Sequence, residues 1–258
     1  MWEFSISVAS CEKEIAKYIF QTLKANTIEF ESVVTCFEQG DRIFVLVACP
    51  KSEQTRVKVF IERCVVKIVC GFLKERFLDE KLIMPTQEII SKTAFKKALI
   101  SFDKETDFYI VSKNLDLNKN LYIDSFYNFK LKALKNKWEE LVVLANENSD
   151  YLVSRDAFFD LLKFLIDNLE IGREEVDIFE DENGYSITSQ EPILDFECEK
   201  LSKEKLVSSI IEICPKKINF FCRSDDTTAN FLSKIFDKRV SVCYSKSVET
   251  IENFSAMK

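Results

Sequence analysis

The cysteines that end two predicted strands are the side chains best placed to do chemistry. Residues 217–222 and 240–243 read as strands joined by a helix, and Cys222 and Cys243 lie at their carboxyl ends. Such strands are usually parallel neighbours, so the two thiols could approach each other at the sheet edge where ligands often bind, as a redox pair or as metal ligands. Buried cysteine more often packs as a small hydrophobe, and no C-x-x-C pair exists. We therefore expect the pair to be inert.

A polar loop after the first of these strands is a candidate for anion binding. Residues 223–228 read Arg-Ser-Asp-Asp-Thr-Thr and open the helix, where backbone N–H groups can hold a phosphate. The negative charges of Asp225 and Asp226 would repel an anion. Acidic residues in a first turn usually cap the helix and offset its dipole instead. We expect this loop to be structural.

The histidine and glycine counts remove the commonest catalytic and nucleotide-binding designs. The chain has no histidine, which is the usual general base near neutral pH and the commonest transition-metal ligand. Its four glycines cannot form a Walker phosphate loop or a dinucleotide fingerprint. We predict no catalytic, cofactor-binding or metal-binding residues, no cofactor, and a protein that is not an enzyme. An enzyme using cysteine, aspartate, lysine or arginine in a crevice is a third alternative.

Four lysines in one predicted helix have the composition of a nucleic-acid patch. They are Lys130, Lys132, Lys135 and Lys137, with Phe129 and Trp138 interleaved. On a helix these lysines spread to both sides of the apolar stripe, as solvated edges do. Nucleic-acid binding is therefore the alternative function and not the favoured one.

Acidic residues gather around a predicted hairpin turn. They are Asp177, Glu180, Asp181 and Glu182. Their carboxylates could coordinate a hard cation, but they lack the ordered spacing of a calcium loop. We expect a solvated hairpin tip.

The elements that position these residues predict an α+β fold in three parts. Residues 1–84 predict an N-terminal β-α-β-β-α unit. Its strands cover 4–8, 28–37 and 43–49, with Gly40 in the hairpin loop between the last two. Its first helix is capped by Ser10, and its long second helix runs from residue 53 to Pro85.

Residues 85–170 predict a helical middle region. Thr86 caps its first helix, and further helices start near Asp124 and around Phe158. The stretch 103–114 is ambiguous between helix and strand.

Residues 171–258 predict a C-terminal α/β unit with a mixed sheet. It holds a hairpin at Asn183-Gly184, a short third run over 193–196, a helix from Ser202 to Pro215, and a β-α-β crossover. Helix should exceed strand, because glycine and proline number only four each.

Charge and composition point to the cytoplasm. The net charge of −7 repels phosphate backbones and anionic lipid surfaces. The chain has nine cysteines, an odd number, and their spacing is irregular. This pattern favours reduced thiols over a framework of disulfides. The acid at Glu3 does not fit a secretory signal, and the longest apolar run, residues 43–49, is too short to span a bilayer.

Three ordered segments between about residues 120 and 245 resemble the YtxC-like family. They are Asp124–Lys132 (DSFYNFKLK), the amphipathic helix around Phe158–Leu165, and Ile210–Ile218 (IIEICPKKI). None is a catalytic signature. The resemblance implies a spore-forming Gram-positive bacterium, an intracellular protein and a link to sporulation. From the resemblance and the missing catalytic motifs we expect a non-enzymatic, sporulation-associated protein that presents a surface to a protein partner.

Overall fold

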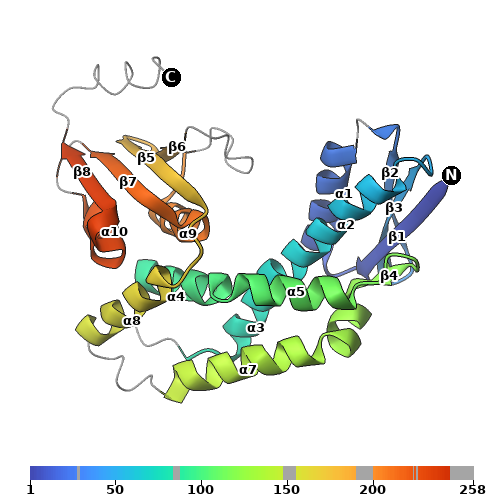
Figure 1. The fold of residues 1–258 in the computed structure, drawn as a ribbon, viewed down its shortest axis with the longest axis horizontal. Coiled ribbons are helices and arrows are strands. Elements are labelled where there is room, and N and C mark those ends of the chain that lie inside the picture. Colours follow the sequence, from blue (N-terminus) through green and yellow to red (C-terminus); the bar gives the residue numbers. More distant parts are fainter. Residues whose placement is uncertain are drawn as a thin grey trace. The chain divides into compact units, whose positions relative to one another are not determined.

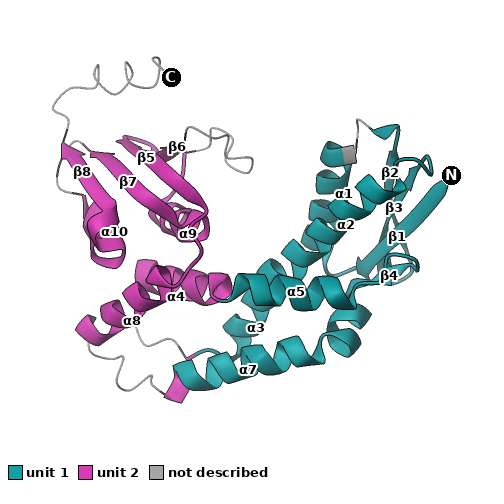
Figure 2. Cartoon of the chain, viewed as in Figure 1, with its two compact units in different colours: residues 1–82, 103–145 teal, residues 83–102, 146–258 magenta. Residues whose placement is uncertain are grey.

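The computed structural model describes residues 1–27, 30–83, 88–147, 155–189, 200–222, 224 and 226–244. The chain forms two compact units (Figures 1 and 2). Unit 1 is Met1–Leu82 with Asp103–Ala145, and unit 2 is Ile83–Phe102 with Asn146–Lys258. Each unit has a four-stranded mixed sheet and helices, which confirms the predicted α+β class. The three-part division at residues 84 and 170 stays a prediction.

The sheet of unit 1 has the strand order β2-β3-β1-β4. Its strands are β1 (Trp2–Ala9), β2 (Val33–Gln39), β3 (Arg42–Cys49) and β4 (Leu121–Tyr122). β2 pairs antiparallel with β3, as predicted. β1 also pairs antiparallel with β3, and β4 adds in parallel to β1. Gly40 turns the β2–β3 hairpin with a φ of 64°, a conformation that favours glycine. Alternate β3 side chains are buried, so one face of the sheet belongs to the core.

One nearly continuous helical segment packs in unit 1 after this sheet. It consists of α2 (Gln54–Lys67), a π-helical stretch (Ile68–Leu73) and α3 (Lys74–Lys81). The long helix was predicted, but the π-helical stretch was not. The helix before it, α1 (Lys13–Thr27), shows that the predicted Ser10 cap is wrong. Ser10 lies in a turn, where its backbone N–H donates to the carbonyl of Asp41 at 2.8 Å.

The rest of unit 1 is helical and interrupted at Leu131. Its elements are α5 (Lys104–Asn114), α6 (Ile123–Ser125), a π-helical turn (Phe126–Lys130) and α7 (Lys132–Glu147). The stretch that was ambiguous in sequence is thus the helix α5. The predicted single helix from Asp124 is broken, because Leu131 leaves helical geometry with φ −106° and ψ 31°. Its side chain is fully buried, so the break delivers it to the core.

Unit 2 has the strand order β6-β5-β7-β8. Its elements are α4 (Ile89–Ser101), α8 (Arg155–Asp167), β5 (Arg173–Asp181), β6 (Gly184–Thr188), α9 (Lys203–Ile213), β7 (Pro215–Cys222), α10 (Thr227–Phe236), a short 3-10 turn (Asp237–Arg239) and β8 (Val240–Tyr244). The β5–β6 hairpin and the parallel β7–α10–β8 crossover are both confirmed. In addition, β5 pairs in parallel with β7.

The helix boundaries of unit 2 follow local signals. The hydroxyl of Ser202 caps α9 by accepting from the backbone N–H of Lys205, as predicted. Pro215 ends that helix and begins β7. Thr86, Pro85 and the predicted run at 193–196 lie outside the described residues. No helix in the described part of the chain combines the length and the apolar character needed to cross a bilayer.

Candidate functional site

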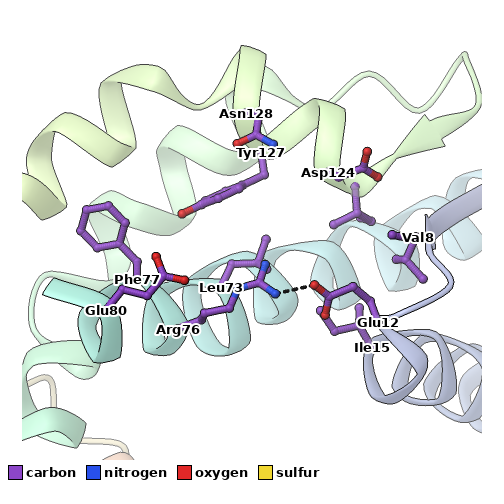
Figure 3. Close-up of a pocket in the computed structure, with 12 residues that line it drawn as sticks. Val8, Glu12, Ile15, Leu73, Arg76, Phe77, Glu80, Asp124, Tyr127 and Asn128 are labelled. Carbon is purple, nitrogen blue, oxygen red and sulfur yellow. Dashed lines mark hydrogen bonds and ion pairs between the residues drawn. The ribbon is translucent and has the colours of Figure 1, made fainter.

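A pocket of about 290 Å³ lies in unit 1, where the end of β1 meets α1, α3 and the turn that follows β4 (Figure 3). We call it the Tyr127 pocket. Its apolar lining is Val8, Ala9, Ile15, Leu73, Phe77 and Ile123. Its polar lining is Glu12, Arg76, Glu80, Asp124, Tyr127 and Asn128. A second pocket of about 420 Å³ adjoins it, because the two share the Glu12, Ile15, Leu73 and Arg76 side chains.

An ion pair crosses the Tyr127 pocket between α3 and the residue that precedes α1. The Arg76 guanidinium bonds the carboxylate of Glu12, and Figure 3 shows the two side chains pointing toward each other. The hydrogen bond to Glu12 raises the pKa of Arg76 above its ordinary value. This arginine is therefore committed to a partner within the pocket.

A second ion pair lies at the β1 end. Arg42 on β3 binds Asp124 through its two terminal guanidinium nitrogens, and Nη1 lies 3.2 Å from Oδ2 of Asp124. The hydrogen bond from Arg42 lowers the pKa of Asp124. Arg42 also lies 5.0 Å from the ring centre of Tyr122. Asp124 belongs to one of the three segments that carry the family resemblance.

Glu80 is the third carboxylate of the pocket lining, and no ion pair involves it among the described residues. Its charge raises the pKa of both Arg76 and Tyr127. Burial is the larger cause of the raised Tyr127 pKa, so this phenol is neutral at neutral pH. Of the three carboxylates in the pocket lining, Glu12 and Asp124 are paired with arginines, and Glu80 has no ion-pair partner among the described residues.

An aromatic wall backs the pocket. Phe77 and Tyr127 pack against Trp138, with ring centres 5.7 and 6.3 Å from that of the indole. Lys135 covers Tyr127, with its ammonium 5.0 Å from the ring centre and 3.3 Å from Oδ1 of Asn128. The Tyr127 ring thus already interacts with one cation through its π-system.

A buried ionic network fixes this wall. Asp107 accepts hydrogen bonds from Nζ of Lys74 at 2.7 Å, Nε1 of Trp138 at 3.0 Å and Nζ of Lys137 at 2.9 Å. Lys74 and Asp107 are each 1% exposed or less. Burial lowers the pKa of Lys74, although Asp107 opposes that shift. Neither residue was predicted from the sequence, where the only signal is a lysine among the apolar positions Leu73 and Phe77.

The predicted lysine cluster is only partly a solvated surface. Lys130 and Lys132 are exposed, as expected. Lys137 instead pairs with Asp103 and Asp107, and Lys135 packs on Tyr127. Two of the four charges are therefore engaged by neighbouring groups.

The thiols of Cys222 and Cys243 do not meet. In the parallel β7–β8 register Cys243 is opposite Phe221, whereas Cys222 is opposite Tyr244. Because successive side chains alternate between sheet faces, this one-residue offset places the two thiols on opposite faces. Cys222 is buried and Cys243 is exposed. The approach of these thiols predicted from sequence is wrong.

The polar loop and the acidic hairpin have structural contacts. Asp226 caps α10 by accepting from the N–H groups of Thr228 at 2.6 Å and Ala229 at 2.9 Å, as predicted. Arg223 and Asp225 lie outside the described residues. At the hairpin, Asp177 accepts from Asn219 at 2.7 Å and Asp181 pairs with Lys200. No group of three acidic, cysteine or histidine side chains in the described part is arranged to hold a metal.

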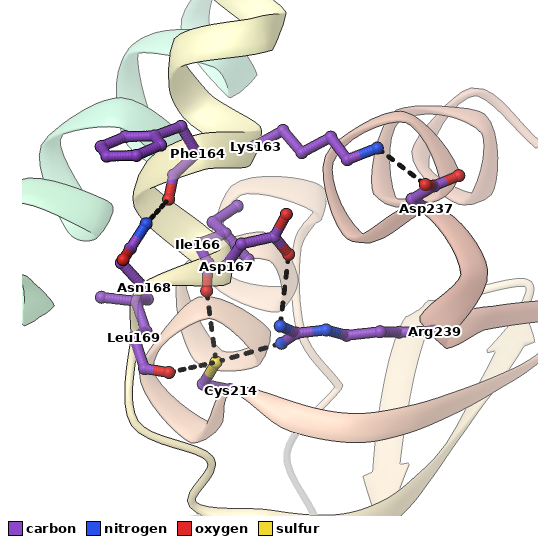
Figure 4. Close-up of polar contacts among 9 residues, drawn as sticks. All are labelled: Lys163, Phe164, Ile166, Asp167, Asn168, Leu169, Cys214, Asp237 and Arg239. Atoms are coloured by element: carbon purple, nitrogen blue, oxygen red, sulfur yellow. Dashed lines mark hydrogen bonds and ion pairs between the residues drawn. The ribbon is translucent and has the colours of Figure 1, made fainter.

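A second polar cluster in unit 2 surrounds Cys214 (Figure 4). Its thiol lies 3.8 Å from the carbonyl oxygen of Ile166 and accepts from Nη1 of Arg239 at 3.6 Å. Arg239 also donates to Asp167 at 3.2 Å. Burial raises the pKa of the Cys214 thiol, which disfavours the reactive thiolate. The cluster ties the end of α8 to the corner between α9 and β7.

Comparison with known proteins gives one match. The model of the YtxC-like family matches residues 79–241. This range includes Glu80, Asp124 and Tyr127 from the pocket and the whole Cys214 cluster. No curated protein and no solved structure matches the chain.

Proposed function

The chain belongs to the YtxC-like family, and from this premise we propose that it is a non-enzymatic, cytoplasmic protein of sporulation that acts by binding a protein partner. Family membership supports the link to sporulation. The mode of action rests on the Tyr127 pocket, which is built in part from the family segment that begins at Asp124.

The surroundings of the pocket suit a protein partner. An exposed aromatic side chain lies beside it: Phe72 lines the adjoining pocket and is 39% exposed. Phe129, the residue after Asn128 in the sequence, is 71% exposed. Aromatic residues are enriched at protein interfaces, where they supply most of the binding energy when they become buried. Apolar walls, a few convergent polar groups and an aromatic rim together favour binding.

The charge states of the pocket support a non-enzymatic role. The pKa of Asp124 is lowered and the pKa values of Arg76 and Tyr127 are raised. Each of these shifts moves the group's titration further from neutrality. A general acid or base works best with a pKa near the operating pH, so these three groups are poorly suited to proton transfer.

Site-specific photo-crosslinking in sporulating cells tests the proposal. A photoreactive residue replaces Asn128, which lines the pocket, and in a matched control it replaces Asn136, which is exposed on α7 outside the lining. We expect one discrete protein adduct from position 128 and none of that mass from position 136. No adduct from either position, or the same adducts from both, would contradict the proposal.

A further inference from the structure

We infer that the Tyr127 pocket binds one basic side chain, an arginine or lysine of the protein partner, with its charged end at Glu80. This inference rests on the proposed function and names the chemistry of the partner. It comes from the charges of the pocket, its walls and its size.

One of the three carboxylates that line the pocket lacks an ion-pair partner among the described residues. Glu12 is neutralised by Arg76, and Asp124 is neutralised by Arg42. Glu80 lines the same pocket, and no ion pair involves it among the described residues. A single positive charge delivered from outside would complete the set. An anion would meet three carboxylates, and the lining arginine is already bonded to one of them.

The walls fit the stem of a basic side chain. Leu73, Ile15 and Val8 form an apolar surface for methylene groups, which arginine and lysine bury while their charged ends stay polar. The Tyr127 ring adds an aromatic surface against which the same stem can pack.

The size of the pocket favours one side chain over a free metabolite. Its volume of about 290 Å³ lies just below the range of about 300–1,000 Å³ typical of small-molecule sites. The exposed Phe72, which lines the adjoining pocket, would contact the rest of the partner's surface.

A binding experiment with a minimal probe tests the chemistry directly. The probe is N-acetyl-arginine amide, and its neutral isostere N-acetyl-citrulline amide is the control. We expect saturable amide shifts at Tyr127 and Asn128 in NMR spectra of the full chain with the arginine probe, and much smaller shifts with citrulline. Glu80→Gln should weaken binding about two- to fivefold, as expected for a partly exposed ion pair. Equal shifts with both probes, or no shifts, would overturn the inference.

Charge reversal separates this inference from the proposed function. Glu80→Lys places an ammonium in the pocket, whereas Glu140→Lys makes the same change at an exposed site on α7 outside the lining. We expect Glu80→Lys to abolish arginine binding and the crosslink from position 128, and Glu140→Lys to preserve both. A crosslink that survives Glu80→Lys would overturn the inference that the pocket binds a basic side chain, but it would still support a protein partner. An arginine probe that binds without any crosslinked partner would instead count against the proposed function.

Discussion

Trp138 donates its indole N–H to Asp107 at 3.0 Å, and this bond joins the aromatic wall of the Tyr127 pocket to a buried ion pair. The same carboxylate oxygen accepts from Lys74 at 2.7 Å. A change at Asp107 should therefore affect both the stability of unit 1 and the shape of the pocket.

Replacing Asp107 with alanine should strongly destabilise unit 1. The change removes the carboxylate that pairs with the buried Lys74 ammonium, and breaking a buried pair typically costs about 3–5 kcal/mol. Urea unfolding followed by near-ultraviolet circular dichroism measures this loss. Glu105→Ala, at an exposed position on the same helix, should change stability little. An equal loss of unfolding free energy in the two variants would show that the buried network stabilises unit 1 no more than an exposed glutamate does.

Tyr185 should make unit 2 sensitive to alkali. Burial raises the pKa of its phenol from 10.0 to about 12. A raised pKa means that the folded state resists ionisation, so this contribution is complete below the unfolded pKa and is lost as pH rises toward the folded one. The loss is on the order of 2 kcal/mol. Tyr185→Phe, which removes the bonds to Asp226 and Thr228, should flatten the fall in unfolding free energy above pH 10.0. An unchanged slope would contradict this assignment.

The cysteines should fall into two reactivity groups. Cys11 and Cys243 are exposed and should be alkylated in the native chain at neutral pH. Cys36 is also exposed, but desolvation raises the pKa of its thiol, so it should react more slowly than these two. Cys64 and Cys70 are buried, and burial raises the pKa of each to about 12, so both should react only after unfolding. Mass spectrometry of time-resolved alkylation separates the groups. Early labelling of Cys64, or a Cys222–Cys243 disulfide after mild oxidation, would contradict the structure.

Two glycine substitutions should have opposite effects. A Cβ at Gly172 would lie 2.4 Å from the carbonyl oxygen of Ile213, so Gly172→Ala should destabilise unit 2 by about 1–3 kcal/mol. A Cβ at Gly71 meets nothing within 4 Å, and Gly71→Ala should stabilise its helical segment by up to about 1 kcal/mol. Thermal unfolding of both variants is the measurement, and a stabilised Gly172→Ala chain would count against the packing of that corner.

Nucleic-acid binding through the Lys130–Lys137 helix should be absent. Lys137 is paired with Asp103 and Asp107, and the whole chain carries a charge of −7. We expect no shift of single- or double-stranded DNA on gels, even at low salt. A steeply salt-dependent shift that disappears in a Lys130→Glu, Lys132→Glu variant would establish the alternative function.

Local signals in the sequence predicted much of the fold. Apolar alternation located β1 and β3, and helical spacing located α4 and α8. The Ser202 cap and the β7–α10–β8 order were also readable, because each depends on residues that are close in sequence. The Asn183-Gly184 hairpin was found too, although its two loop residues are Glu182 and Asn183.

Features set by tertiary packing were not readable. Lys74 and Asp107 come from different helices, and nothing in either segment identifies the other as its partner. The break at Leu131 leaves no mark in the apolar spacing, because its buried side chain lies four residues after Tyr127 and three before Leu134, as in a continuous helix. A one-residue register offset, which no periodicity shows, separates Cys222 from Cys243. The Tyr127 pocket likewise combines residues from Val8 to Asn128.

The interleaving of the two units along the chain constrains how the polypeptide can fold during synthesis. The segment from Ile83 to Phe102 belongs to unit 2 but is translated before unit 1 is complete. Helix α4 within it packs against α9, so it must wait for roughly 100 further residues to leave the ribosome. A nascent chain halted between these helices would expose the face of α4 that is buried in the folded protein. Chaperone binding should therefore be strongest during synthesis of the segment between α4 and α9.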